Sequence, residues 1–389
     1  MLLLYLLAIL TSSVVSSTPR PIACVTGGSG FLGLEVVSQL LERGFLVRAT
    51  VRDPMSRRKV KPLRELGHQS QLTIVQADLL QGVESFKECV AGAKFLFHTA
   101  SPFQTKNITN PDEQLVQPAL RGTEAAVGAA LLSPTIKYII ITSSIAATMS
   151  SSQDKNGDCF TEMDWNIKST AEAGGLDAYR YSKTVAEKRF WEMLDQVERK
   201  IEGAAILPSF IIGPQRTTRI DGESATFIKM ALEGVVPYRG DTAMCDVRDV
   251  ALAHIHVAEM MMSNSNHDNN ARRSQEKRRY IISSETAVRR SSVLTWLRNE
   301  YPQYSIAGGD ETSIRAAAAA ATIPKQRLFC PTNLKDIQMH DGLNMHEPKD
   351  SILAMATAML NRLADMGLVN PIPTGSGEVH DLRSNDADL

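Results

Sequence analysis

The chain is poor in the residue patterns that mark several large protein classes. Its five cysteines, Cys24, Cys89, Cys159, Cys245 and Cys330, are widely scattered, with no Cys-x-x-Cys pair and no histidine cluster at metal-ligand spacing. We therefore expect unpaired thiols rather than a disulfide framework, and no metal site. The formal net charge is −1, and no long basic run is interleaved with aromatic residues. A nucleic-acid partner is therefore not expected.

The remaining composition is that of an ordinary globular protein. Hydrophobic residues make up 43% and charged residues 22% of the 389 positions, which is enough apolar material for a sizeable core. This length allows one large α/β domain, or a nucleotide-binding domain with a smaller partner. We expect a small molecule as the ligand.

An apolar leader occupies residues 1–17. The run from Leu2 to Leu10 is followed by small residues, as in a signal peptide, but no basic residue precedes it. It is shorter than the roughly 20 residues that span a bilayer, which favours a cleaved signal over a stable transmembrane helix. A short uncleaved anchor and an organelle-targeting segment are the alternatives. Because unpaired cysteines fit poorly with an oxidising compartment, localisation is left open between the secretory pathway or an organelle and the cytoplasm.

From Pro21 onward, apolar β-branched segments alternate with segments of helical periodicity. This alternation predicts βαβ units with right-handed crossovers, and so an α/β fold of the Rossmann type with a doubly wound parallel sheet. Ligands in such folds bind beyond the carboxyl ends of the strands. The expected strands are residues 22–26, 45–51, 72–76, 94–97, 138–142 and 280–282; the expected helices include 54–66, 83–90, 113–132, 225–234 and 350–368.

The stretch VTGGSGFLG at residues 25–33 joins the first strand to the first helix. Gly27 would permit the tight turn, Gly30 the approach of the phosphates, and Gly33 close packing of the helix on the strand. The helix N-terminus adds free N–H donors and a positive dipole end. The stretch therefore predicts a dinucleotide site, with contacts from Gly27, Ser29, Gly30, Phe31, Leu32 and Gly33.

Polar and small residues follow the next three strands. Arg52 ends the second strand, where an arginine accommodates the 2′-phosphate of NADP. Asp78, followed by Leu79, ends the third, where a carboxylate could accept the adenine amino group or cap a helix. After the fourth strand, His98 is expected to be a packed strand-end residue, whereas Thr99, Ala100 and Ser101 offer a surface for the dinucleotide.

Two further segments carry groups suited to carbonyl chemistry. Thr142, Ser143 and Ser144 close the fifth strand, and Tyr179 lies four residues before Lys183 on a helix, so that both project from one face. A free phenol has a pKa near 10; an adjacent ammonium and a cationic nicotinamide ring would lower it toward the working range. A serine hydroxyl can stabilise negative charge that develops on a carbonyl oxygen.

With these motifs in order, the chain resembles the extended short-chain dehydrogenase/reductase superfamily, within it the dihydroflavonol 4-reductase, cinnamoyl-CoA reductase and fungal aldehyde/ketone reductase group. The likeness spans about residues 21–369. Its carriers are VTGGSGFLG, VRATVRDP, Ala77-Asp78-Leu79, FHTASPF, ITSS, YRYSKTVAEK, Pro208 to Pro214 and CDVRDVA.

The resemblance implies an NADPH-dependent reduction of an aldehyde or ketone, with a small-molecule carbonyl substrate. Tyr179 would be the proton donor, Lys183 would hold the nicotinamide ribose and lower the pKa of Tyr179, and Ser144, rather than Ser143, would polarise the carbonyl. The remaining cofactor contacts that it implies are Arg52 and Lys59 at the 2′-phosphate, Pro208 and Ile211 along the nicotinamide carboxamide, and Ser224.

Three departures from the group limit what the resemblance implies, and one of them is the apolar leader, which is unusual for the soluble members. The run Asp177-Ala178-Tyr179-Arg180-Tyr181 lacks the Asn-Trp-Tyr-Cys-Tyr type of signature, which disfavours a cinnamoyl-CoA substrate. Residues 263–278 form a polar, low-complexity insertion that we expect to be a solvated surface loop.

The expected organisation is a cofactor-binding core at residues 21–207 that carries the catalytic residues, and a mixed region at 208–369 that completes the core and forms the smaller substrate-binding part. Residues 370–389 would be a flexible tail, and the protein a monomer or homodimer. The alternative functions are a 3β-hydroxysteroid dehydrogenase, an NAD-dependent sugar-nucleotide epimerase or dehydratase, and a non-catalytic NADP-binding regulatory protein.

Overall fold

The computed structural model describes most of the chain between Arg20 and Val369. The described residues are 20–101, 108–150, 152–153, 155, 158–217, 220, 222–235, 242–264, 278–304, 306, 329–335 and 343–369. The leader at 1–17, most of the insertion at 263–278 and the tail at 370–389 lie outside them. Among the described helices, none is long and apolar enough to cross a membrane.

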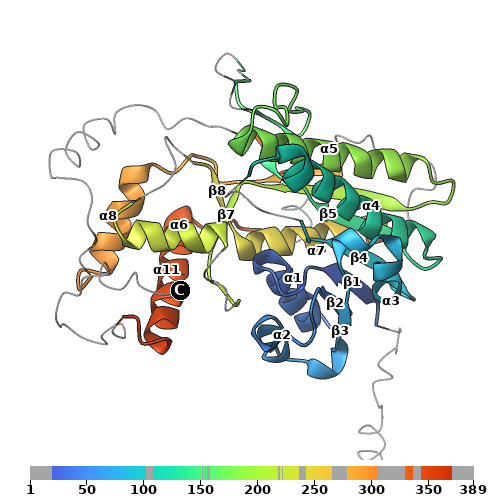
Figure 1. Cartoon of the computed structure of the whole chain (residues 1–389), viewed down its shortest axis with the longest axis horizontal. Coiled ribbons are helices and arrows are strands. Elements are labelled where there is room, and N and C mark those ends of the chain that lie inside the picture. Colours follow the sequence, from blue (N-terminus) through green and yellow to red (C-terminus); the bar gives the residue numbers. More distant parts are fainter. Residues whose placement is uncertain are drawn as a thin grey trace, which may run out of the picture.

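A sheet of seven parallel strands forms the centre of the molecule, in the order β3-β2-β1-β4-β5-β6-β9 (Figure 1). The chain steps outward from β1 in one direction and then from β4 in the other, so that the order reverses between these two strands. This is the doubly wound topology, and the predicted fold class is confirmed. The strands are β1 (Ile22–Thr26), β2 (Leu46–Val51), β3 (Leu72–Gln76), β4 (Phe95–His98), β5 (Tyr138–Thr142), β6 (Glu202–Pro208) and β9 (Arg279–Ile282).

Helices cover both faces of this sheet, which explains why β1, β4 and β5 are nearly continuous apolar runs. In Figure 1, α4 and α5 lie side by side, and the two helices pack together on their face of the sheet. One face is covered by α1 (Phe31–Glu42), α2 (Arg57–Arg64) and α7 (Val247–Asn264), the other by α3 (Lys87–Val90), α4 (Gln117–Leu132) and α5 (Gly175–Asp195).

A third apolar cluster lies beside the main sheet, around a short parallel pair of strands, β7 (Phe210–Ile212) and β8 (Met244–Asp246). Three helices contribute to it: α6 (Glu223–Leu232), α8 (Arg290–Glu300) and α11 (Pro348–Asp365). This cluster belongs to the region that the sequence assigned to the smaller substrate-binding part. The division of the chain at residues 207 and 208 stays a prediction.

The differences from the predicted elements lie at their ends. The helix expected at 54–66 is shorter because Asp53 forms a turn, accepting a hydrogen bond from the Met55 N–H at 2.9 Å, before α2 begins. The segment expected as a helix at 83–90 is a 3₁₀ turn followed by α3, and the one expected at 113–132 starts as a π-helical turn at Asp112–Val116.

The prediction of unpaired thiols is wrong, because four of the five cysteines form disulfides. Cys24 in β1 is bonded to Cys89 in α3, and Cys159 to Cys330. The two pairs are separated by 65 and 171 residues, so only the tertiary fold brings their Cα atoms to 5.3 and 5.6 Å. Cys245 is free and buried. The cysteines are therefore compatible with an oxidising compartment, and the compartment itself stays a prediction.

Cys159–Cys330 is partly exposed, whereas Cys24 and Cys89 are fully buried. We therefore expect a mild reductant to open the Cys159–Cys330 bridge first and to lower the melting temperature. Replacing both residues with serine should cost about 2–5 kcal/mol of unfolding free energy, since the bridge restricts the unfolded chain.

Calorimetry with and without reductant measures this effect. The Cys159→Ser/Cys330→Ser variant should no longer respond to a mild reductant, whereas Cys245→Ala should respond as the natural chain does. An unchanged melting temperature in the double variant would contradict the prediction.

Candidate active site

The turn between β1 and α1 has the backbone that the glycine pattern predicted. Gly27 has φ +67°, a conformation that favours glycine. A Cβ on Gly33 would lie 2.2 Å from the Gly27 carbonyl oxygen, so only glycine lets α1 pack this closely on the turn. Gly30 precedes α1 with no side-chain cap, and no acidic side chain lies in the first turn. The N–H groups of that turn are therefore suited to bind phosphate.

Thr26, at the end of β1, links this turn to the end of β4. Its hydroxyl is 2.9 Å from His98 Nδ1 and accepts the Ala100 N–H at 3.1 Å, and its carbonyl oxygen accepts the Thr99 hydroxyl at 2.6 Å. His98 is buried as expected, and desolvation together with the Lys183 charge lowers its pKa to about 3. Thr99 and Ala100 are thus fixed beside the glycine turn.

A group of basic side chains lies beyond the end of β2. Arg52 is exposed directly after the strand, and Lys59 is partly exposed in α2. No acidic residue lies in the first turn of α2. The structure therefore leaves these two cations at the rim of the sheet, as an anionic phosphate would require.

The sequence left two roles open for Asp78, adenine binding and helix capping, and the structure shows the capping role. Its carboxylate accepts the Leu80 N–H at 3.0 Å and caps a 3₁₀ turn. Leu79 is partly exposed in that turn and packs near Gly122 of α4. The adenine contact stays a prediction.

The two serines after β5 have different partners. Ser143 is buried and donates to Glu187 Oε2 at 2.5 Å. Ser144 accepts the Ala146 N–H at 3.1 Å and hydrogen-bonds the phenol of Tyr179. The structure thus places Ser144, the serine chosen from the resemblance, at the tyrosine.

Tyr179 and Lys183 lie on one face of α5, but their electrostatics differ from the prediction. Desolvation raises the pKa of Tyr179 to about 12; the hydrogen bond from Ser144 opposes this shift, and the Glu223 charge adds to it. The chain's own groups therefore raise the phenol pKa, whereas a lowering by Lys183 was expected. Desolvation likewise lowers the pKa of Lys183 to about 8, and Glu187 opposes that shift.

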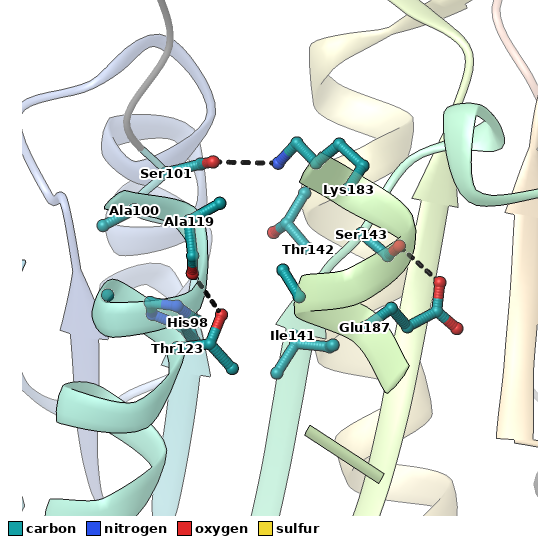
Figure 2. A pocket seen from close by; sticks show the side chains of 12 residues that line it. His98, Ala100, Ser101, Ala119, Thr123, Ile141, Thr142, Ser143, Lys183 and Glu187 are labelled. Atoms are coloured by element: carbon teal, nitrogen blue, oxygen red, sulfur yellow. Dashed lines mark hydrogen bonds between the residues drawn. The ribbon is translucent and has the colours of Figure 1, made fainter. Parts of the chain in front are cut away.

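Lys183 directs its ammonium across a small pocket toward Ser101. Its Nζ donates to Ser101 Oγ at 3.0 Å (Figure 2). The pocket lies between β4 and α4 on one side and β5 and α5 on the other; its lining includes Ala100, Thr142 and Glu187. The structure therefore brings Ser101 and Lys183 together, as two segments 82 residues apart in sequence.

The remaining predicted contacts lie along β6, β7 and α6. Pro208 is buried at the end of β6, and Ile211 is partly exposed in β7. Ser224 donates its hydroxyl to the Ile211 carbonyl oxygen at 2.6 Å. Ser224 therefore positions the neighbouring β7 backbone, and its contact with the cofactor stays a prediction.

Sequence reasoning missed two buried residues behind the site. Glu187 contacts Ser143, and its signal was its place four residues after Lys183, one helical turn along the same face. His254 on α7 lies with Nε2 2.7 Å from the Thr142 hydroxyl and Nδ1 2.7 Å from the Val250 carbonyl oxygen. Nothing local in the sequence joins His254 to Thr142, since 112 residues separate them.

Comparisons with known proteins agree with this geometry. The profile of the 3-beta hydroxysteroid dehydrogenase/isomerase family matches residues 24–295. A cinnamoyl-CoA reductase of Medicago truncatula is 33% identical over 241 residues, covering 62% of this chain and 73% of that protein. The dihydroflavonol 4-reductase of Arabidopsis thaliana is 31% identical over 297 residues, covering 73% and 70%.

Among solved structures, the Gre2–NADPH complex from Candida albicans superposes with a TM-score of 0.70 at 25% identity, covering 88% of this chain and 99% of that one. The predicted resemblance to this group of reductases is confirmed. Among the described residues, no group of side chains could hold a metal ion.

Two buried histidines make stability depend on pH. Desolvation lowers the pKa of His254 to about 4 and that of His98 to about 3, against about 6.5 when unfolded. Between these values the unfolded chain binds more protons, so stability is full above pH 6.5 and falls as the pH decreases. At pH 5 each histidine should remove about 2 kcal/mol of unfolding free energy relative to neutral pH.

Denaturant unfolding at pH 7 and pH 5 measures the loss. His254→Gln should remove about half of it, whatever its effect on stability at pH 7. His68→Asn changes an exposed histidine of left-handed conformation and should leave the loss intact. The same pH dependence in His254→Gln as in the natural chain would contradict this account.

Proposed function

The chain belongs to the 3-beta hydroxysteroid dehydrogenase/isomerase family, whose members here are oxidoreductases acting on carbonyl groups, and we propose that it reduces an aldehyde or ketone with NADPH. The observation that carries the proposal is the meeting of Ser144 with Tyr179, and of Lys183 with Ser101, at the carboxyl edge of the sheet. Ligands of doubly wound sheets bind at this edge.

The residues present fit a dinucleotide. The uncapped N-terminus of α1 and the tight Gly27 turn suit the pyrophosphate, Arg52 and Lys59 suit a 2′-phosphate, and Ser101 with Lys183 suits the nicotinamide ribose. When bound, the reduced cofactor supplies a hydride. The solved structures that this chain resembles include Gre2 of Candida albicans in complex with NADPH, which supports the choice of NADPH over NADH.

The chain's own groups would manage the substrate oxygen. Ser144 hydrogen-bonds the carbonyl oxygen and orients it, which stabilises the negative charge that develops there. Tyr179 donates its phenolic proton to the same oxygen. Because burial raises the pKa of Tyr179 to about 12, the phenol stays protonated at neutral pH, the form that reduction needs.

Replacing Tyr179 with phenylalanine removes only the donor hydroxyl. We expect kcat to fall by roughly 10²–10⁴-fold while NADPH still binds. Loss of the reduced-nicotinamide absorbance with a panel of aldehydes and ketones measures kcat, and quenching of protein fluorescence measures binding. Tyr181→Phe is the matched control, since Tyr181 lies off the shared face of Tyr179 and Lys183.

Full activity in Tyr179→Phe would contradict the mechanism. The family description also covers hydroxysteroid dehydrogenases, so the assay includes hydroxysteroids with NAD or NADP in the oxidative direction. Turnover only in those reactions would replace the proposed direction and substrate class.

Arg52→Gln tests the cofactor choice. Loss of one charged hydrogen bond to a 2′-phosphate costs about 1.5–3 kcal/mol, so the KM for NADPH should rise about 10–100-fold. The KM for NADH, which lacks that phosphate, should not change. Arg64→Gln removes an exposed charge from the other end of α2 and serves as the control. An unchanged ratio of the two KM values in Arg52→Gln would contradict the assignment.

A further inference from the structure

A buried ion pair lies directly behind the site. Glu187, one turn after Lys183 on α5, is 1% exposed, and Arg279, the first residue of β9, is 0% exposed. Arg279 Nε donates to Glu187 Oε1 at 2.7 Å. Burying two charges costs much of what their attraction returns, so such a pair is weak evidence for a purely stabilising role.

We propose that Glu187 is a positioning residue for the reaction: its carboxylate fixes Ser143 and Ser144 at the end of β5 and provides a buried negative charge that stabilises the Lys183 ammonium. This inference rests on the proposed reductase function for its kinetic consequences. It extends that function to a residue that reaches the reacting groups only through others.

The serine pair depends on the second carboxylate oxygen. Glu187 Oε2 accepts the Ser143 hydroxyl at 2.5 Å (Figure 2), while Oε1 also accepts the Trp191 indole N–H at 3.3 Å. Ser144, the next residue, is extended and hydrogen-bonds Tyr179, two turns before Glu187 on the same helix. Holding Ser143 against Glu187 therefore fixes the backbone that carries Ser144 beside Tyr179.

The carboxylate is itself held in place from behind. Arg279 Nη1 donates to the carbonyl oxygens of Glu162, at 2.5 Å, and Asp164, at 2.7 Å, and its guanidinium lies 3.8 Å from the centre of the Trp165 ring. The segment at 162–165 precedes α5 in sequence. Arg279 therefore ties Glu187 to both the sheet and this segment, and leaves it little freedom to rotate.

The charge at Glu187 matters because Lys183 is buried. An ammonium removed from water loses part of its proton affinity unless an anion lies near it; desolvation lowers the pKa of Lys183 to about 8, and Glu187 opposes this. His98 on β4 is neutral in the working range, since its own pKa is about 3. Among the described residues, the titratable and charged groups that act on Lys183, on Tyr179 or on Glu187 include His98 from β4, Tyr179 and Glu187 from α5, Glu223 from α6 and Arg279 from β9.

Two substitutions at Glu187 separate charge from shape. Glu187→Gln keeps the size of the side chain and loses its charge. We expect kcat to fall tenfold or more. The alkaline limb of the profile of kcat against pH, which Lys183 sets when it loses its proton, should move down by about one pH unit. Glu187→Asp keeps the charge, so its alkaline limb should stay in place. Glu192→Gln, five residues further along α5 and exposed, is the control for both. If Glu187 had only a structural role, kcat would fall equally in Glu187→Gln and Glu187→Asp, and the alkaline limb would not move in either variant. That result would overturn the proposal.

Glu187→Gln leaves Arg279 without its counter-charge, which can prevent folding. The Glu187→Gln/Arg279→Met variant removes both charges, so that the shift of the alkaline limb can still be measured in a folded protein. Ser143→Ala tests the serine separately: kcat should fall with no movement of the limb, and an unchanged kcat would overturn the positioning of Ser144 through Ser143.

A measurement without turnover separates this inference from the proposed function. Competitive acylation of lysines across a pH series, read by mass spectrometry of the full-length protein, gives the pKa of Lys183 directly. It should fall in Glu187→Gln and stay in Glu187→Asp even if no carbonyl compound is reduced. An equal pKa in the natural chain and in Glu187→Gln would overturn the role of the charge.

Discussion

The burial of one ammonium group, that of Lys183, constrains the whole carboxyl edge of the sheet. A buried ammonium is stabilised by hydrogen-bond acceptors and by a nearby anion, and a second cation beside it would destabilise it. Ser101 accepts its hydrogen bond, Glu187 supplies the nearby carboxylate, and the burial of His98 keeps that imidazole neutral. Three elements, β4, α5 and the segment after β4, are thus fitted around a single charge.

The glycine turn and Lys183 are joined through a short series of hydrogen bonds, each of which involves at least one side chain. Thr26 connects the glycine turn to His98, Thr99 and Ala100, and Ser101 follows directly with its bond to Lys183. A change in the packing of β1 against β4 would therefore alter both the glycine turn and the position of Ser101 beside Lys183. A Cβ on Gly27 would lie 3.1 Å from Ala100, so a larger residue there would push the two strand ends apart.

The segment before α5 connects the site to the C-terminal part of the chain. The buried Glu162 carboxylate accepts the N–H groups of Ile281 in β9 and Thr332, and Cys159 is bonded to Cys330 nearby. The same segment holds Arg279, whose partner is Glu187. A covalent bond and a buried carboxylate thus fasten residues 329–335 to the segment before α5, and Arg279 connects that segment to Glu187 on α5.

The sequence by itself determined the features that depend on near neighbours. Backbone geometry and the periods of the strand and the helix set the alternation of apolar segments, the Gly27 turn and the spacing of Tyr179 and Lys183. The doubly wound sheet and the shared face of α5 could therefore be predicted. The sequence also predicted that the residues following the strands lie at one edge of the sheet, because parallel strands bring their carboxyl ends to the same edge. Only the tertiary structure decided which cysteines pair, that Lys183 donates to Ser101, that the phenol pKa of Tyr179 rises, and that Glu187 and Arg279 meet behind the serines. The physical reason is that disulfide geometry, desolvation and ion pairing depend on distances between residues far apart in the chain, and no local pattern carries those distances.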